Sequence, residues 1–181
     1  MPSVDEMITD ILKREGGFVN HQNDRGGATK YGITQKTLSA YLGHAALVSE
    51  VENLSVDVAR DIYERNYYIA PRIDRLPEPI QAFIFDCAVN HGPRRAIKFV
   101  QSIYNQLETD PNKQIAEDGA MGPNTRKAAE ITQQRMGVFF LKALLEERRN
   151  FYKTIVDADD SQRVFLAGWM NRVDEFEQEV A

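Results

Sequence analysis

Apolar residues recur at intervals of three and four along most of the chain, which is the spacing of amphipathic helices. The first stretch ends at Gly16, while Thr34 and Ser55 are placed to cap later helices and Pro123 to begin one. The pattern therefore predicts a mainly α protein. The predicted helices cover residues 4–15, 34–42, 55–68, 80–90, 94–107, a segment from 123 onward, 137–156 and 162–180.

The helical pattern breaks between residues 18 and 33, where glycines and polar turn formers replace periodic apolar residues. Glycine permits backbone conformations with positive φ, so this stretch is predicted to be a loop or a small β-hairpin. It is too long for an idle connection in a compact domain, and long ordered loops commonly carry function. No 20–50-residue repeat and no Gly/Ser linker divides the chain, which favours a single domain.

Charge and composition exclude several classes of protein. The chain of 181 residues holds 22 Lys and Arg against 27 Asp and Glu, so its net charge of −5 argues against a non-specific nucleic-acid binder. The single cysteine, Cys87, excludes an internal disulfide and fits a reducing compartment. No stretch reaches the length of a membrane span, and the N-terminal residues lack the apolar core of a signal peptide. We therefore expect another factor to deliver the protein to any substrate outside the cytoplasm.

Glu15 is the first candidate for acid–base chemistry, because it stands at the end of the first predicted helix. The negative end of the helix dipole favours a protonated carboxyl, as a general acid requires. The alternative is a solvent-exposed glutamate without a catalytic role. Asp24 follows nine positions later, and two carboxyl groups that flank a cleft are what glycoside hydrolysis needs. Thr29 adds a hydroxyl that could help position a water, whereas Asp24 could instead be a turn residue beside Arg25.

The segment from residue 15 to 34, EGGFVNHQNDRGGATKYGIT, resembles the motif of the phage and bacterial N-acetylmuramidases of glycoside hydrolase family 108. That motif reads E-G-G-(Y/F), a short gap, then D-x-G-G-x-T-x-x-G-I-T, and every fixed position is filled. Residues 63–68, YERNYY, look like the aromatic segment of the family, with Tyr68 where Trp is usual. Residues 85–101 are similar to its next helix-turn-helix block.

The second half of the chain resembles the peptidoglycan-binding region that follows this catalytic segment. DGAMGPNT at residues 118–125 matches its D-G-x-x-G-P-x-T element, and FLAGWMNRV at residues 165–173 looks like its closing motif. The resemblance implies one lysozyme-like domain over residues 1–181, composed of a catalytic muramidase region, 1–93, and a peptidoglycan-binding-like helical region, 94–181. Such proteins are sometimes labelled secretion activator proteins.

The resemblance also implies roles for individual residues. Glu15 matches the catalytic glutamate that protonates the glycosidic oxygen. Asp24 and Thr29 match positions that hold and activate the attacking water in phage-type lysozymes, although the gap between them is one residue shorter here. Gly27 would let the backbone approach a sugar closely. Tyr31 could stack on a sugar ring or could be a core tyrosine.

Three further residues have competing interpretations. Asn90 could hydrogen-bond an N-acetyl group of the substrate, or it could cap the end of its helix. Cys87 and His91 are four positions apart, but a core cysteine beside a surface or capping histidine is the favoured interpretation over a catalytic or metal-binding pair. No metal and no cofactor are expected.

The sequence as a whole predicts a hydrolase that cleaves the bond between N-acetylmuramic acid and N-acetylglucosamine in peptidoglycan, by single displacement with inversion. A lytic transglycosylase, a non-catalytic peptidoglycan-binding or secretion-accessory protein and, less favoured, a Cys87 thiol peptidase are the alternatives. The absence of a predicted signal peptide fits an enzyme of phage or prophage endolysin type, held in the cytoplasm and released to the cell wall through a separate holin or pore.

Overall fold

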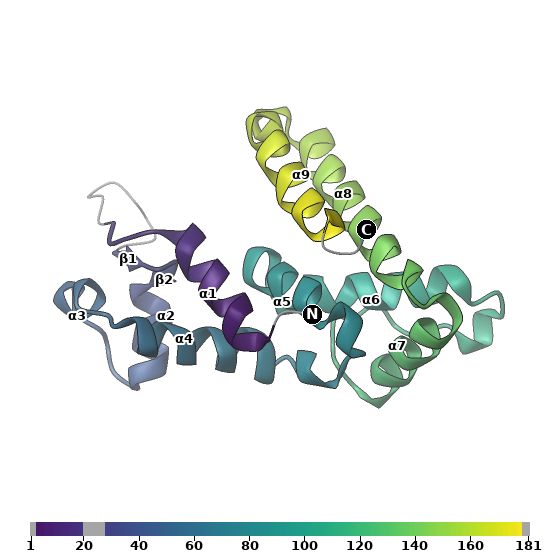
Figure 1. Ribbon diagram of the computed structural model, residues 1–181, viewed down its shortest axis with the longest axis horizontal. Coiled ribbons are helices and arrows are strands. Elements are labelled where there is room, and N and C mark those ends of the chain that lie inside the picture. Colours follow the sequence, from purple (N-terminus) through teal and green to yellow (C-terminus); the bar gives the residue numbers. More distant parts are fainter. Residues whose placement is uncertain (1–2, 20–27, 179–181) are drawn as a thin grey trace. The chain divides into compact units, whose positions relative to one another are not determined.

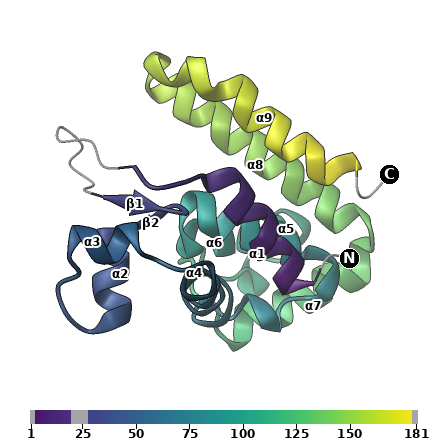
Figure 2. The same ribbon diagram turned by 60° about the vertical axis from the view of Figure 1, so that its left-hand side comes forward.

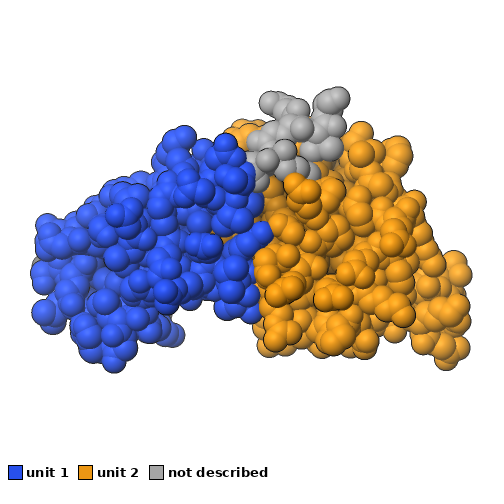
Figure 3. Space-filling view, turned by 60° about the horizontal axis from the view of Figure 1, so that its bottom comes forward, with its two compact units in different colours: residues 1–70 blue, residues 71–181 orange. Residues whose placement is uncertain are grey.

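The computed structural model describes residues 3–19 and 28–178, and the chain forms two compact units, residues 1–70 and 71–181 (Figure 3). Most of the described residues are helical, and the strands among them form one two-stranded sheet. The mainly α class with a short β-hairpin after the first helix is therefore confirmed. The prediction of one domain with a boundary between residues 93 and 94 stays a prediction.

The first unit is a set of short helices around a β-hairpin (Figure 1). The strands pair antiparallel, with Thr29 opposite Thr34 and Lys30 opposite Ile33. The elements of this unit are α1 (Val4–Glu15), β1 (Thr29–Lys30), β2 (Ile33–Thr34), α2 (Gln35–Leu42), α3 (Val48–Glu52), α4 (Val56–Tyr63) and a π-helix, η1 (Glu64–Ile69).

The predicted caps are present in this unit. The Thr34 hydroxyl accepts a hydrogen bond from the Thr37 amide at 3.1 Å, and α2 ends at Gly43 in the left-handed conformation. Ser55 caps α4 in the same way. The single helix predicted over residues 55–68 is wrong in one respect, because α4 ends at Tyr63 and the chain continues as a π-helix. The short helix α3 was not predicted.

The second unit is a helical bundle around α5. Its elements are η2 (Ile73–Arg75), α5 (Glu78–His91), α6 (Pro93–Leu107), η3 (Pro111–Lys113), α7 (Pro123–Met136), α8 (Phe139–Ala158), η4 (Asp160–Gln162) and α9 (Arg163–Gln178). Eight of the fourteen residues of α5 are buried, so this helix forms the centre of the unit and α6 and α8 pack on it. The helices α8 and α9 lie side by side as a hairpin in both ribbon views (Figures 1 and 2).

Candidate active site

Glu15 is the last residue of α1, and the contacts of that helix determine where its side chain lies. The helix begins with a capping box in which the Glu6 amide donates to the Ser3 hydroxyl and the Glu6 carboxylate accepts from the Ser3 amide. Arg60 of α4 then holds α1 in place, since it contacts the Asp5 carboxylate at 2.6 Å and donates to Thr9. Buried residues on α1 face the interior of the unit, while Glu15 itself is exposed at the helix end.

The two-residue turn between β1 and β2 lies directly against Glu15. Tyr31 and Gly32 both have positive φ, 52° and 73°, which is the pattern of a type I′ hairpin turn. The Tyr31 amide donates to the carbonyl of Gly16 at 3.2 Å and so joins the turn to the end of α1. A Cβ atom at Gly32 would lie 2.9 Å from Oε2 of Glu15, closer than real Cβ contacts occur. Glycine at position 32 therefore makes room for the glutamate carboxyl group.

Two tyrosines from α4 and the π-helix complete the surroundings of Glu15. The Tyr63 hydroxyl donates to the Tyr31 carbonyl at 2.8 Å, and it would lie 2.6 Å from a Cβ at Gly32. The ring of Tyr67 lies 5.6 Å from that of Tyr63. Burial and, second, the negative charge of Glu15 raise the pKa of Tyr67. Both tyrosines therefore belong to the surroundings of Glu15.

Thr29, the predicted water-positioning residue, lies in β1 on the same hairpin as this turn. Its amide and carbonyl both form hydrogen bonds with Val19, each at 2.8 Å. The backbone at Thr29 therefore lies between Val19 on one side and β2 on the other. The structure thus places the Glu15 carboxyl beside Gly32 of the hairpin turn, and Thr29 begins the strand that leads into this turn. Asp24 and Gly27, the other predicted site residues of this region, lie outside the described residues.

Asn90, the predicted ligand of an N-acetyl group, belongs to the second unit. Its side-chain amide donates to the main-chain carbonyl of Asp86 at 2.7 Å and contacts the Asp86 carboxylate at 3.3 Å. These bonds lie within α5, so the amide supports its own helix in this structure. Substrate binding by Asn90 stays a prediction.

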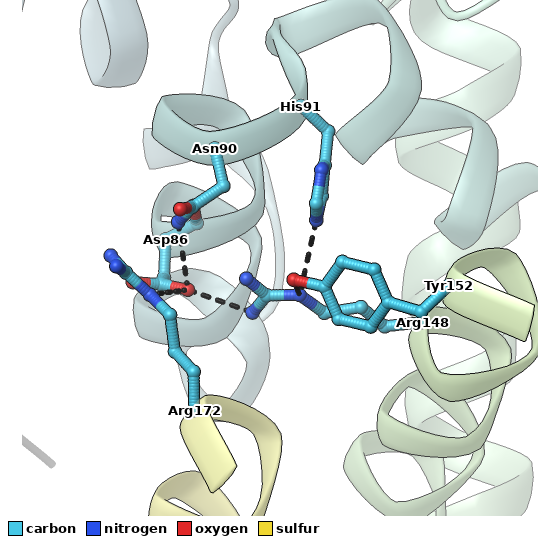
Figure 4. A network of polar contacts seen from close by, with 6 residues as sticks. All are labelled: Asp86, Asn90, His91, Arg148, Tyr152 and Arg172. Carbon is cyan, nitrogen blue, oxygen red and sulfur yellow. Dashed lines mark hydrogen bonds and ion pairs between the residues drawn. The ribbon is translucent and has the colours of Figure 1, made fainter. Parts of the chain in front are cut away.

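Asp86 is the centre of a buried network that joins three helices of the second unit (Figure 4). Its Oδ2 lies 2.7 Å from Nη1 of Arg148 on α8, and its Oδ1 lies 2.7 Å from Nη2 of Arg172 on α9. Burial alone would raise the pKa of the Asp86 carboxyl, but the two arginines hold it below its usual range. This network joins α5, α8 and α9, and it leaves Nη2 of Arg148 buried without a hydrogen-bond partner among the described residues.

The pairing of Cys87 with His91 as a catalytic dyad is excluded by their surroundings. Cys87 is fully buried, and burial raises the pKa of its thiol to about 12, so it is not a nucleophile near neutral pH. Burial, with the charge of Arg148, lowers the pKa of His91 to about 4. Nε2 of the neutral His91 accepts a hydrogen bond from Nε of Arg148 at 3.2 Å. The interpretation of Cys87 as a core residue is confirmed.

The DGAMGPNT segment is held by one buried side chain of α6. The Gly119 amide donates a hydrogen bond to Oε1 of Gln101 at 2.9 Å. Nε2 of Gln101 donates to the Asp118 carboxylate, the Ala120 carbonyl and the Thr125 hydroxyl. A Cβ at Gly119 would lie 2.4 Å from the carbonyl oxygen of Arg94. The fixed residues of this motif therefore hold the loop that leads into α7 against α6.

The described residues were also searched for a metal site and for a membrane-spanning helix. Within residues 3–19 and 28–178, no group of three or more His, Cys, Asp or Glu side chains is arranged to hold a metal ion. No helix in the described part of the chain is long and apolar enough to span a bilayer.

Two protein families and a solved structure are similar to this chain. The model of the family described as glycosyl hydrolase 108 matches residues 8–92, and that of a predicted peptidoglycan domain matches residues 95–174. The solved structure of SagA from Brucella abortus is similar, with a TM-score of 0.75 and 29% identity over 98% of this chain and 92% of that one. No curated protein sequence matches this chain.

The helical fold and the family matches together define a lysozyme-like glycoside hydrolase. Residues 8–92 belong to the glycosyl hydrolase 108 family, and together with the predicted peptidoglycan domain of residues 95–174 they support a peptidoglycan hydrolase.

The sequence did not indicate that Tyr63 and Glu15 both lie against the turn at Gly32. It placed Tyr63 in the aromatic segment of residues 63–68 without connecting that segment to the glutamate. A signal was available, because Tyr63 and Tyr67 are four positions apart and so share one side of a helix.

Proposed function

We propose that this protein is an N-acetylmuramidase, which hydrolyses the bond between N-acetylmuramic acid and N-acetylglucosamine in peptidoglycan. Glu15 acts as the general acid and protonates the glycosidic oxygen. Asp24, helped by the Thr29 hydroxyl, activates the attacking water. Displacement occurs in one step with inversion at the anomeric carbon.

The observation that carries the proposal is the position of the Glu15 carboxyl. It lies at the end of a helix, exposed, and against a hairpin turn whose Gly32 leaves no side chain in its way. Backbone without a Cβ allows a sugar ring to approach closely, and an exposed carboxyl can reach the glycosidic oxygen of a bound glycan. Residues 15–34 also fill every fixed position of the muramidase motif.

A turbidity assay tests the role of Glu15. Outer-membrane-stripped Gram-negative cells are treated with the wild type, with Glu15→Gln and with Asp10→Asn, which changes an exposed carboxylate on the same helix. General acid catalysis contributes about 10²–10⁴-fold, so Glu15→Gln should clear the cells slower by that factor. Asp10→Asn should act like the wild type. Clearance by Glu15→Gln at the wild-type rate would refute the assignment.

Mass spectrometry of the released sugars separates hydrolysis from the lytic transglycosylase alternative. Hydrolysis leaves a reducing N-acetylmuramic acid end, whereas a transglycosylase leaves an anhydromuramyl end because the 6-hydroxyl of the sugar attacks in place of water. Asp24 and Thr29 favour hydrolysis, since a transglycosylase has no need of residues that activate water. Peptidoglycan binding without any loss of turbidity would instead indicate a non-catalytic protein.

The water-activating residues are tested by Asp24→Asn and Thr29→Val. We expect the first to lower the rate by about 10²-fold or more and the second by a smaller factor, because the hydroxyl assists a water that the carboxylate activates. Equal rates for Asp24→Asn and the wild type would remove Asp24 from the mechanism while leaving Glu15 in place.

A further inference from the structure

Two glycines follow Glu15 in the chain, and the backbone requires only the first of them. Gly16 has a φ of 75°, in the left-handed region that other residues rarely adopt. The φ of Gly17 lies outside that region, and no atom of the described residues lies within 4 Å of the position that a Cβ would take there. Gly17 is also exposed. A residue with a side chain would therefore fit both the backbone and the space at position 17.

Glycine at a position without such a constraint is a disadvantage to the fold. It loses more conformational freedom on folding than any other residue. Replacing it by alanine therefore commonly stabilises a protein when the native backbone tolerates the change. Within the described residues nothing needs glycine at position 17, and the open space beside its backbone is available to a group from outside the chain.

The main chain around Gly17 is held in place from both sides. Before it, the carbonyl of Gly16 accepts a hydrogen bond from the Tyr31 amide at 3.2 Å. After it, the amide and carbonyl of Val19 both bond to Thr29, each at 2.8 Å. Gly17 thus lies on a short segment that is fixed to the hairpin at each end.

This segment also joins the two described residues of the proposed mechanism. Two peptide units separate Gly17 from Glu15, so their Cα atoms lie at most about 7.6 Å apart. The same segment reaches Thr29 through the two hydrogen bonds of Val19. A glycan that is bound at Glu15, with the attacking water near Thr29, would therefore come close to the exposed backbone of Gly17.

We propose that a pyranose ring of the glycan strand lies directly against the main chain at Gly17, which makes Gly17 a substrate-binding residue of the muramidase. This inference rests on the proposed function, because it requires that the glycan reaches Glu15. A hydrogen in place of a side chain lets the ring come into van der Waals contact with the backbone. A methyl or isopropyl group at position 17 would take the volume that the ring occupies and would weaken substrate binding.

The test compares Gly17→Ala and Gly17→Val with the wild type on soluble peptidoglycan strands. Gly17→Val should lower kcat/KM by about tenfold or more, mainly through a higher KM, and Gly17→Ala should do so by a smaller factor. The thermal unfolding midpoint of Gly17→Ala should equal or exceed that of the wild type, because the backbone tolerates a Cβ. Ala45→Val is the matched control, since it adds methyl groups to another exposed residue of the first unit, and its kinetics should match the wild type.

Two results would overturn the inference. The first is a wild-type kcat/KM for both Gly17 variants, which would show that no part of the substrate needs the space at position 17. The second is a lower unfolding midpoint for Gly17→Ala together with lower activity, because glycine would then be required by the fold and not by the substrate.

A binding measurement separates this inference from the proposed mechanism. Calorimetry gives the Kd of soluble peptidoglycan strands for Glu15→Gln alone and for Glu15→Gln combined with Gly17→Val. The second substitution should raise the Kd by about tenfold or more, and equal Kd values would contradict the contact at Gly17. Retained activity of Glu15→Gln in the turbidity assay would contradict the acid role of Glu15 alone, and the KM of the Gly17 variants would still test the contact.

Discussion

Nη1 of Arg148 lies 2.7 Å from Oδ2 of Asp86, and neither side chain is more than 8% exposed. Removing one partner of a buried ion pair leaves the other charge without full compensation. Arg148→Met should therefore lower the free energy of unfolding by about 3 kcal/mol, even though Arg172 still contacts Asp86.

Urea denaturation followed by circular dichroism measures this loss. Arg163→Met is the control, because its ion pair with Asp160 is exposed and should contribute less than about 1 kcal/mol. Equal effects of the two substitutions would show that the buried network does not stabilise the second unit.

His91 should make the stability of the protein depend on pH in the weakly acidic range. Its pKa is lowered from 6.5 to about 4 in the folded state, so the unfolded chain binds a proton at a pH where the folded one does not. The free energy of unfolding should then decrease as the pH falls from 6.5 toward 4. Below that window, protonation of Asp86 becomes the next contribution.

Replacing His91 by glutamine tests this dependence, because glutamine does not titrate and can still accept from Arg148. Denaturation at several pH values should give a smaller slope between pH 4 and 6.5 for His91→Gln than for the wild type. An unchanged slope would assign the dependence to other groups.

Gly32 should not tolerate even the smallest side chain. A methyl group there would push against Tyr63 and Glu15 and would also strain a backbone with φ of 73°. We expect Gly32→Ala to lower the free energy of unfolding by about 1–3 kcal/mol and to lower lytic activity at least tenfold, because the carboxyl is displaced.

Gly43→Ala isolates the contribution of backbone strain. Gly43 has a φ of 77°, but a Cβ there would have no atom within 4 Å. It should cost about 1 kcal/mol of stability and leave turbidity clearance unchanged. If both variants retain full activity, the Gly32 contact has no importance for the site.

Gln101 should contribute more to the free energy of unfolding than an exposed glutamine does, because its side chain holds the loop of residues 118–125. Its substitution by methionine leaves the Gly119 amide and the Thr125 hydroxyl with fewer partners, so we expect a loss of about 1–3 kcal/mol. Thermal unfolding measures it, with exposed Gln106→Met as the control, for which a change within about 0.5 kcal/mol is expected. A stable Gln101→Met would leave the motif without a structural explanation.

Features determined by neighbouring residues could be predicted from the sequence. The end of α1 at Gly16, the Thr34 cap and the start of α7 at Pro123 follow from local backbone preferences and side-chain hydrogen bonds. Glu15 could be singled out for the same reason, since its position at a helix end before two glycines is visible in the sequence.

Features that depend on distant residues could not be predicted. The bond from Tyr63 to Tyr31 joins positions 32 apart, and that from Arg148 to Asp86 joins positions 62 apart, so neither leaves a local pattern. The π-helix was missed because its apolar spacing over six residues resembles that of an α-helix.

The π-helix also determines how this region tolerates a change in chain length. Its hydrogen bonds span five residues, as in the bond from the Ala70 amide to the Arg65 carbonyl, at 2.8 Å. Deleting one residue between 64 and 66 would let the segment wind as an ordinary α-helix, and Tyr67 would then rotate about 100° around the axis relative to Tyr63. Most helix ends tolerate the deletion of one residue. Here such a deletion should turn the ring of Tyr67 away from Glu15. In a homologous protein, a one-residue gap in this segment would therefore indicate a changed position of the ring that corresponds to Tyr67.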